Sequence, residues 1–211
     1  MRIFLFVNLL LITLLVTPID SFALQNEPIL LPDTILNWDP LFGDDFQKGL
    51  YRTTLDISKH HLTGFIYIKK ISDTSYRILF SNDFGMQIFD FEFSTNELVV
   101  HYCFPSMDRK SLLKLLENDF RILLFSNQGM KTITQDQSEN KEELSFKIKA
   151  KTGKWIYRIS SVSRKILSIR SVGKFVSKTR IDLTHSADIV TGISISNPLI
   201  KLSITLNQIS R

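Results

Sequence analysis

Cys103 is the only cysteine among the 211 residues and the first candidate for chemistry, as a nucleophile. A nucleophilic cysteine needs a thiolate, which a neighbouring base or positive charge stabilises. His101 would share a strand face with Cys103, and His185 is the other candidate base. Tyr102 and Phe104 would point to the opposite side of such a strand, so they do not indicate whether the surroundings of the thiol are polar or apolar. A buried, inert thiol is the simpler interpretation, and we predict that the protein is not an enzyme.

Histidine side chains also raise the question of a metal site. The adjacent His60 and His61 would point in opposite directions from an extended chain, so they make a poor pair of ligands. A site built on His101 and Cys103 needs a third ligand, and no neighbouring residue has the spacing of one. We therefore predict no metal and no cofactor.

Two pairs of carboxylates lie close together in the sequence, Asp44–Asp45 and Asp90 with Glu92. Asp90 and Glu92 share one face of a strand and therefore lie close together, as the two carboxyl groups of a glycosidase do. In glycosidases, however, the fold brings together two carboxyl groups from separate parts of the chain. An outward, solvated face is the simpler interpretation. The sequence has no phosphate-binding glycine loop, no nucleophile-elbow serine and no zinc-finger spacing.

The stretch Tyr76–Phe93 indicates that most of these candidate residues lie on β-strands. Two strand patterns meet at Asn82–Gly85, and Phe89, Phe91 and Phe93 share one face of the second strand. Other runs rich in β-branched and aromatic residues, separated by short polar breaks, also predict strands. The predicted strands are Leu50–Ser58, Leu62–Ile71, Ser75–Asn82, Met86–Ser94, Glu97–Phe104, Glu142–Ala150, Lys154–Ser160, Arg164–Arg170, Gly173–Leu183, Ala187–Ile195 and Leu199–Ile209.

A helix is predicted in the middle of the chain. Ser106 is a suitable N-cap for a helix over Met107–Asn118. Residues Asp119–Phe125 either prolong this helix or begin another strand, and Asn127–Asn140 is expected to be a surface loop. The apolar stripe of the helix consists of Leu112, Leu113, Leu115 and Leu116.

About eleven strands with two helical segments predict a mainly β (α+β) fold. The other helical segment is expected nearer the N-terminus, within residues 35–48, where Trp38, Phe42 and Phe46 fit one face of a short amphipathic stretch. A single antiparallel sheet of this width curls, because sheets twist. We therefore predict a curved antiparallel sheet, as a closed barrel or an unclosed half-barrel, covered by a helical lid.

Residues 1–23 are typical of a secretory signal peptide. Arg2 precedes an apolar run from Ile3 to Val16, and Ser21–Ala23 has the pattern of a cleavage site. The run is shorter than the ~20 apolar residues that span a bilayer. No cysteine follows the cleavage site to anchor a lipid, and one cysteine makes no internal disulfide. We therefore expect residues 24–211 to form one soluble domain in a bacterial periplasm.

Charge is distributed unevenly along the chain, whose formal net charge is +5. Residues 24–140 hold 11 Lys+Arg against 16 Asp+Glu, whereas residues 141–180 hold 12 against 2. This predicts a basic surface on the second half, facing an anionic partner or solvent. The predicted signal peptide argues against nucleic acid as that partner and favours an anionic membrane surface or an envelope protein.

The abundance of apolar residues leaves two interpretations of the interior. A curved sheet lined by Phe and Leu, with an amphipathic helix as a lid, can enclose a cavity for acyl chains. A fully packed core without a cavity is an equal alternative, and the sequence does not separate the two.

The order of the elements resembles a known family. The segments LTGFIYIKK (62–70), YRILFSND (76–83) and GMQIFDFEF (85–93) follow a signal peptide and a helical segment, and precede a helix and a second all-β half. This order is similar to that of the periplasmic lipoprotein-localisation carriers, LolA and LolB. The resemblance implies an unclosed barrel with a helical lid over an apolar cavity, which carries lipoprotein acyl chains from the inner to the outer membrane.

Within that family the chain is more similar to the soluble carrier, because it lacks the cysteine that anchors the receptor-type protein. The receptor has an exposed apolar side chain on a protruding loop, and Phe84 is its counterpart by position alone. The resemblance therefore implies that Phe84 contacts a membrane, whereas the simpler expectation from the turn's own residues is that Phe84 packs back on the core.

We predict a periplasmic carrier or binder of lipids or lipoprotein acyl chains, which acts as a monomer without a cofactor in the periplasm or at the outer membrane. The alternative is a non-catalytic envelope interaction protein with a packed core and a basic docking face. The side chains predicted to hold acyl chains are Phe65, Tyr67, Phe80, Phe89, Phe91, Phe93, Leu112 and Leu116.

Overall fold

A computed structural model of the chain describes residues 41–42, 45–125, 130–136, 142–150, 153–172, 178–187 and 189–210. The predicted signal peptide over residues 1–23 and the predicted helical position of Trp38 lie outside these ranges. Of the helical segment predicted within residues 35–48, the described residues 41–42 and 45–48 are not helical, so the prediction is wrong there, although Phe42 and Phe46 are buried in the core. The described part contains the helix α1 (Lys110–Leu124) and twelve strands. The strands are β1 (Lys48–Ile57), β2 (His60–Ser72), β3 (Ser75–Asn82), β4 (Gln87–Ser94), β5 (Leu98–Cys103), β6 (Met130–Asp136), β7 (Glu143–Ala150), β8 (Gly153–Ser160), β9 (Ile166–Val172), β10 (Arg180–Ser186), β11 (Ile189–Asn197) and β12 (Leu202–Ser210).

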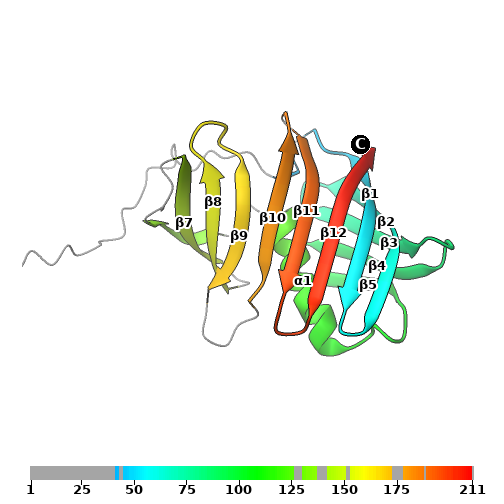
Figure 1. Cartoon of the computed structure of the whole chain (residues 1–211). Coiled ribbons are helices and arrows are strands. Elements are labelled where there is room, and N and C mark those ends of the chain that lie inside the picture. Colours follow the sequence, from blue (N-terminus) through cyan, green and yellow to red (C-terminus); the bar gives the residue numbers. More distant parts are fainter. Residues whose placement is uncertain are drawn as a thin grey trace, which may run out of the picture.

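All twelve strands belong to one antiparallel sheet, in the order β5-β4-β3-β2-β1-β12-β11-β10-β9-β8-β7-β6 (Figure 1). Neighbours in the sheet are neighbours in the sequence, except at the centre, where β1 pairs with β12. The edge strands β5 and β6 flank α1 in the sequence and do not pair with each other. The sheet is therefore an unclosed half-barrel, as predicted.

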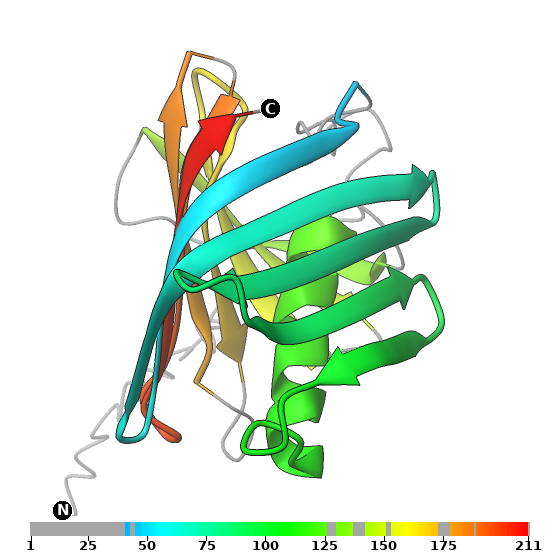
Figure 2. The same ribbon diagram turned by 90° about the vertical axis from the view of Figure 1, so that its right-hand side faces the viewer.

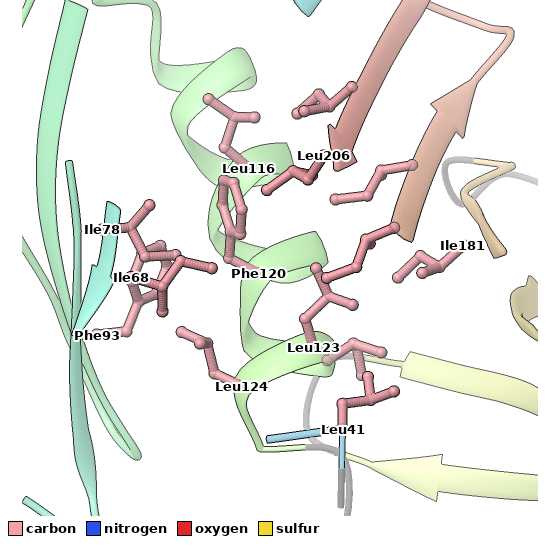
Figure 3. Packing of buried hydrophobic residues seen from close by; sticks show 14 of the residues in the cluster. Leu41, Ile68, Ile78, Phe93, Leu116, Phe120, Leu123, Leu124, Ile181 and Leu206 are labelled. Atoms are coloured by element: carbon pink, nitrogen blue, oxygen red, sulfur yellow. The ribbon is translucent and has the colours of Figure 1, made fainter. Parts of the chain in front are cut away.

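The helix α1 lies on the concave side of the sheet, and the strands β1–β5 curve around it (Figure 2). In its N-terminal half the buried side chains are Leu112, Leu115 and Leu116, which share one face, whereas residues 119–124 are all buried, so the C-terminal half is enclosed on every side. Leu116, Phe120 and Leu123 project into the space between two parts of the curved sheet, one formed by strands β2–β4 and the other by strands β10 and β12 (Figure 3). The facing residues are Ile68, Ile78 and Phe93 on one side and Ile181 and Leu206 on the other.

The helix differs from its predicted bounds at both ends. It begins at Lys110 with Arg109 as the N-cap, because residues 105–107 form a turn in which the Met107 N–H donates to the Phe104 carbonyl at 2.8 Å. The predicted N-cap at Ser106 is therefore wrong. At the other end, the first of the two alternatives is confirmed, because residues 119–124 prolong the helix and do not form a strand, with Phe125 as the C-cap.

One strand of the structure was not expected from the sequence. β6 lies within the segment Asn127–Asn140, which we predicted to be a loop, and it raises the strand count from about eleven to twelve. Its residues lack apolar alternation, but it pairs along β7, with Ile133 opposite Ile148. Pairing with a neighbour thus formed a strand that local preference did not predict.

The remaining strands agree with the prediction to within a few residues at most of their ends. Two ends in the described ranges differ by three residues: β10 ends at Ser186 and not at Leu183, and β12 begins at Leu202 because residues 198–201 form a turn. The predicted start of β10 at Gly173 lies outside the described residues. Lys201 in the turn before β12 has a φ of 51°, which is in the left-handed region and not in the extended region of a strand, so β12 begins only after it. Among the described residues, no helix has the length and the apolar character needed to cross a membrane.

Candidate functional site

A cleft of about 850 Å³ lies at one end of the sheet, beside the first turns of α1. Its walls come from the β1–β2, β3–β4 and β11–β12 turns and from the loop that precedes α1. Every second turn of an antiparallel meander lies at the same end of the sheet, and the pairing of β1 with β12 brings the last turn there too. The Ser58 N–H donates to the Lys201 carbonyl at 3.1 Å and joins two of these turns.

The lining of the cleft is mainly apolar. The apolar lining residues are Ile57, Leu62, Met86, Ile88, Phe104, Met107, Leu112, Leu115, Leu199 and Ile200. The polar lining residues are Ser58, Lys59, His60, Ser106, Arg109, Ser111 and Asn197.

Burial separates a floor from a mouth within this lining. The floor consists of side chains that are at most 8 % exposed, namely Ile88, Met107, Leu112 and Leu115. The mouth carries large apolar side chains that face solvent, namely Met86, Leu199 and Ile200, which are 45 %, 61 % and 41 % exposed. The cleft thus leads from an apolar opening to a buried apolar interior.

The C-terminal half of α1 is fixed to the sheet by polar contacts. Arg121 donates to the Ser94 carbonyl, and its Nε donates to Glu117 at 3.0 Å. On the other side of the helix, the Thr179 hydroxyl donates to the Asp119 carboxylate at 3.0 Å. The N-terminal half of α1, in contrast, contributes Leu112 and Leu115 to the cleft. The lid is therefore anchored at one end and borders the cleft with the other.

Asp119 belongs to a buried polar chain that reaches the cleft. The Asn197 amide donates to the Thr179 hydroxyl at 3.2 Å, and the side chains of Asp119, Thr179 and Asn197 are at most 2 % exposed. Asn197 lines the cleft and accepts a hydrogen bond from the Leu199 N–H at 3.2 Å. Burial raises the pKa of Asp119 from 3.8 to about 7, although the Thr179 hydrogen bond opposes this rise.

Four of the predicted acyl-contacting residues form a solid aromatic layer behind α1. Phe80, Phe89, Phe91 and Phe93 are all 0 % exposed. The rings of Phe89 and Phe91 stack at 4.6 Å, and Phe93 packs on Phe120 of α1 at 5.8 Å between ring centroids. This layer is packed and none of the four lines the cleft.

The other predicted residues lie in three different places. Leu112 lines the cleft, and Leu116 is buried one turn further along α1. Phe65 and Tyr67 lie on the opposite face of the sheet from the aromatic layer, because β2 pairs Ile66 with Phe80. The Phe65 ring is 37 % exposed and lies 5.0 Å from the guanidinium carbon of Arg52. A lipid-binding role for these eight residues stays a prediction.

Phe84 is 95 % exposed at the tip of the β3–β4 turn. Its turn is held in place from within, because the Asn82 side-chain oxygen accepts hydrogen bonds from the N–H groups of Phe84 at 3.0 Å and Met86 at 2.9 Å. Asp83 accepts hydrogen bonds from Arg52 and Thr63, which tie the turn to β1 and β2. The exposed ring therefore stands on a well-supported turn and does not fold back on the core.

Cys103, His101 and Asp90, three of the candidate catalytic residues, lie in environments set by their neighbours in the sheet. Burial raises the pKa of the Cys103 thiol, which is the opposite of thiolate activation. His101 contacts Glu92 at 3.0 Å, and the Arg77 guanidinium lowers the pKa of the Asp90 carboxyl that it covers. Asp90 is 7 % exposed, so this carboxylate is shielded and the expected solvated face is wrong at that position.

The two adjacent histidines point to different surroundings, as an extended chain predicts. His60 lines the cleft, whereas the His61 ring contacts the Asp56 carboxylate at 2.5 Å. Within the described ranges, no group of three or more His, Cys, Asp or Glu side chains is arranged to hold a metal ion.

Most cleft residues were not singled out from the sequence. Ile57, Leu62, Met86 and Ile88 lie at strand ends beside turns, where alternation stops being informative. The available signal is topological: alternate turns of a meander share one end of the sheet, so apolar residues that flank them can meet.

The fold has relatives among solved structures. A LolA superfamily protein from Nitrosomonas europaea aligns with a TM-score of 0.55 and 10 % identity, over 77 % of this chain and 83 % of that one. A putative outer membrane lipoprotein-sorting protein domain from Vibrio parahaemolyticus aligns with a TM-score of 0.48 and 5 % identity, over 78 % of this chain and 84 % of its own. No family model and no curated protein matches the sequence. The likeness to the Nitrosomonas protein, at this low identity, shows that the chain has a LolA-like fold.

Proposed function

We propose that the protein is a non-catalytic carrier or binder of lipids or lipoprotein acyl chains in the bacterial envelope, with the acyl chains in the cleft beside α1. The observation that carries this proposal is the cleft of about 850 Å³ with ten apolar lining residues. Pockets for small apolar ligands typically measure roughly 300–1,000 Å³ and carry a few polar groups that orient the ligand.

In this proposal an acyl chain contacts Leu112 and Leu115 of the lid and Ile57, Leu62 and Ile88 of the sheet. Each buried methylene contributes about 0.8 kcal/mol, so ten methylenes contribute roughly 8 kcal/mol before the cost of association. The aromatic layer of Phe80, Phe89, Phe91 and Phe93 supports the lid from behind and keeps the cleft from collapsing. Of the residues predicted from the sequence, Leu112 makes the direct contact.

An envelope location is supported by the LolA-like fold and by the signal-peptide pattern of residues 1–23. The basic second half presents Lys147, Lys149 and Lys154 to solvent on strands β7 and β8. These charges suit an anionic membrane surface or an acidic envelope protein. We propose that the carrier acts as a monomer.

Filling the cleft should abolish lipid binding without unfolding the protein. In Leu112→Trp, the larger side chain occupies the open volume, and we expect at least about a tenfold weaker affinity for a fluorescent fatty acid. The matched control is Leu113→Trp, which adds the same indole on the same helix but outside the cleft lining. Binding is measured by fluorescence titration, and folding by circular dichroism. Equal affinities of the two variants would remove the cleft as the binding site.

We further propose that Phe84 inserts into the membrane surface when the carrier loads or unloads. Its 95 % exposure on a turn that also supplies Met86 to the cleft mouth supports this role. Burying a Phe side chain contributes about 1.5–3 kcal/mol, so Phe84→Asp should lower the partition constant onto vesicles by about 10- to 100-fold.

Vesicles of phosphatidylethanolamine and phosphatidylglycerol serve for the Phe84 measurement, by co-sedimentation. The control is Val162→Asp, because Val162 is also a turn residue, 87 % exposed, between β8 and β9. Equal loss in both variants would mean that added negative charge, and not the Phe84 ring, weakens the contact.

A further inference from the structure

The mouth of the cleft carries three basic side chains, Lys59, His60 and Arg109. Lys59 and His60 come from the β1–β2 turn, and Arg109 is the N-cap residue of α1. All three are exposed, so the ammonium of Lys59 and the guanidinium of Arg109 stay hydrated, and the His60 ring offers a hydrogen-bond donor or acceptor. Among the described residues that line the cleft there is no Asp or Glu.

Several other cations of the half-barrel are held in ion pairs. Arg52, Arg77 and Arg158 each pair with a carboxylate, and His61 contacts Asp56. In the described ranges, the cations Lys59 and Arg109 have no ion-pair partner, and neither has the neighbouring His60 ring. Positive charge is therefore left uncompensated at the opening of an apolar cleft, although acidic residues are numerous in this half of the chain.

Neutral donors accompany the positive charge. Ser58, Ser106 and Ser111 line the cleft, and each hydroxyl can donate one hydrogen bond. The first turn of α1 contains no acidic residue, and the side chain of its N-cap residue makes no capping hydrogen bond. The partial positive charge of the helix N-terminus thus adds to that of the side chains.

From this arrangement we infer that the cleft selects an amphiphile with one anionic head group, a carboxylate or a phosphate, over uncharged acyl compounds. The inference rests on the proposed function and names its substrate class. The tail lies on the floor formed by Ile88, Met107, Leu112 and Leu115, where an anion would lose its hydration at high cost. The head group stays at the mouth, between Lys59, His60 and Arg109, and accepts charge-assisted hydrogen bonds there.

This selectivity is distinct from the basic surface of the second half. Lys147, Lys149 and Lys154 are exposed on strands β7 and β8 and do not line the cleft. They can attract the protein to an anionic surface, but they cannot distinguish one bound amphiphile from another. Discrimination requires charges that touch the head group, and the mouth residues are placed for it.

The test compares ligands that share a sixteen-carbon chain and differ in the head group. Palmitate, palmitoyl lysophosphatidate and hexadecanol compete with a dansyl-labelled undecanoic acid at about pH 8, and inorganic phosphate serves as a free anion. Two charge-assisted hydrogen bonds should make both anionic lipids bind at least about tenfold more tightly than the alcohol. Added salt should narrow this preference, because it screens exposed charges.

The double variant Lys59→Gln/Arg109→Gln should bring the ratio of the palmitate and hexadecanol affinities close to one. The control Lys69→Gln/Lys149→Gln removes the same charge from exposed positions outside the cleft and should keep the wild-type ratio. An unchanged ratio in Lys59→Gln/Arg109→Gln, or equal binding of the acid and the alcohol by the wild type, would overturn the inference and leave the carrier function standing. Displacement of the labelled probe by inorganic phosphate alone would also overturn it. Failure of every lipid to bind would overturn the carrier function as well.

Discussion

Phe120→Ala is expected to lower the free energy of unfolding by about 3–5 kcal/mol, the usual cost of truncating a fully buried Phe. Phe120 is 0 % exposed and connects the lid to the aromatic layer, with ring centroids 6.3 Å from Phe89 and 5.8 Å from Phe93. The cavity left between α1 and β4 cannot collapse easily, since both rings are held by their own neighbours. Urea unfolding followed by circular dichroism measures the change.

Phe84→Ala is the matched control for this truncation, because the chemistry is the same and the Phe84 side chain is 95 % exposed. It should change the free energy of unfolding by less than about 0.5 kcal/mol. If the two variants lost similar stability, Phe120 would not hold the lid on the sheet. The binding proposal needs that attachment, because Leu112 and Leu115 reach the cleft only from a docked α1.

Asp119→Asn should remove a pH dependence of stability between about pH 4 and pH 7. Burial raises the pKa of Asp119 in the folded protein to about 7, against 3.8 ordinarily. The protonated carboxyl therefore stabilises the fold fully below about pH 4, and this contribution is lost as the pH rises through 7. Since each tenfold change in proton affinity corresponds to about 1.4 kcal/mol, the wild type loses up to roughly 4 kcal/mol above pH 7.

The structural reason is that only one of the two Asp119 carboxylate oxygens is paired. Thr179 donates to Oδ1, whereas Oδ2 has no hydrogen-bond partner among the described residues. The amide introduced by Asp119→Asn does not ionise, so the variant should exceed the wild type in stability at pH 8 by about 2–4 kcal/mol and match it within about 1 kcal/mol at pH 4.

The Asp119 measurement is a difference between variant and wild type at each pH. Burial lowers the pKa of His185, and a lowered histidine pKa gives stability that is lost as the pH falls, the opposite direction. Taking the difference cancels this contribution. Asp108→Asn serves as the control, since Asp108 is an exposed carboxylate just before α1. Parallel pH profiles for the wild type and Asp119→Asn would contradict the buried, half-paired carboxyl.

The alternation of apolar and polar residues predicted the buried face of a strand well where one face is apolar and the other is polar. In β12, Leu202, Ile204 and Leu206 are buried, while Ser203 and Thr205 are half-buried. The pattern failed at β2, where Phe65-Ile66-Tyr67-Ile68 is apolar on both faces. There the register with β3, and not the residue types, decides that the isoleucines face the core.

The cleft could not be predicted, for a physical reason that its residues make clear. The sequence predicted a large aromatic interior and left open whether it is packed or hollow. The Phe80–Phe93 layer is packed, whereas the cleft beside α1 lies where Ile57, Met86 and Leu199 approach from three separate turns. Their meeting depends on the long-range pairing of β1 with β12, for which local patterns carry no information.

The most direct test of the account is mass spectrometry of the lipid that accompanies the protein purified from a bacterial envelope. The wild type and Leu113→Trp should release acyl lipids on denaturing extraction, and Leu112→Trp should release little or none. A wild-type protein that carries no lipid, or equal amounts of lipid on Leu112→Trp, would contradict the claim that acyl chains occupy the cleft beside α1.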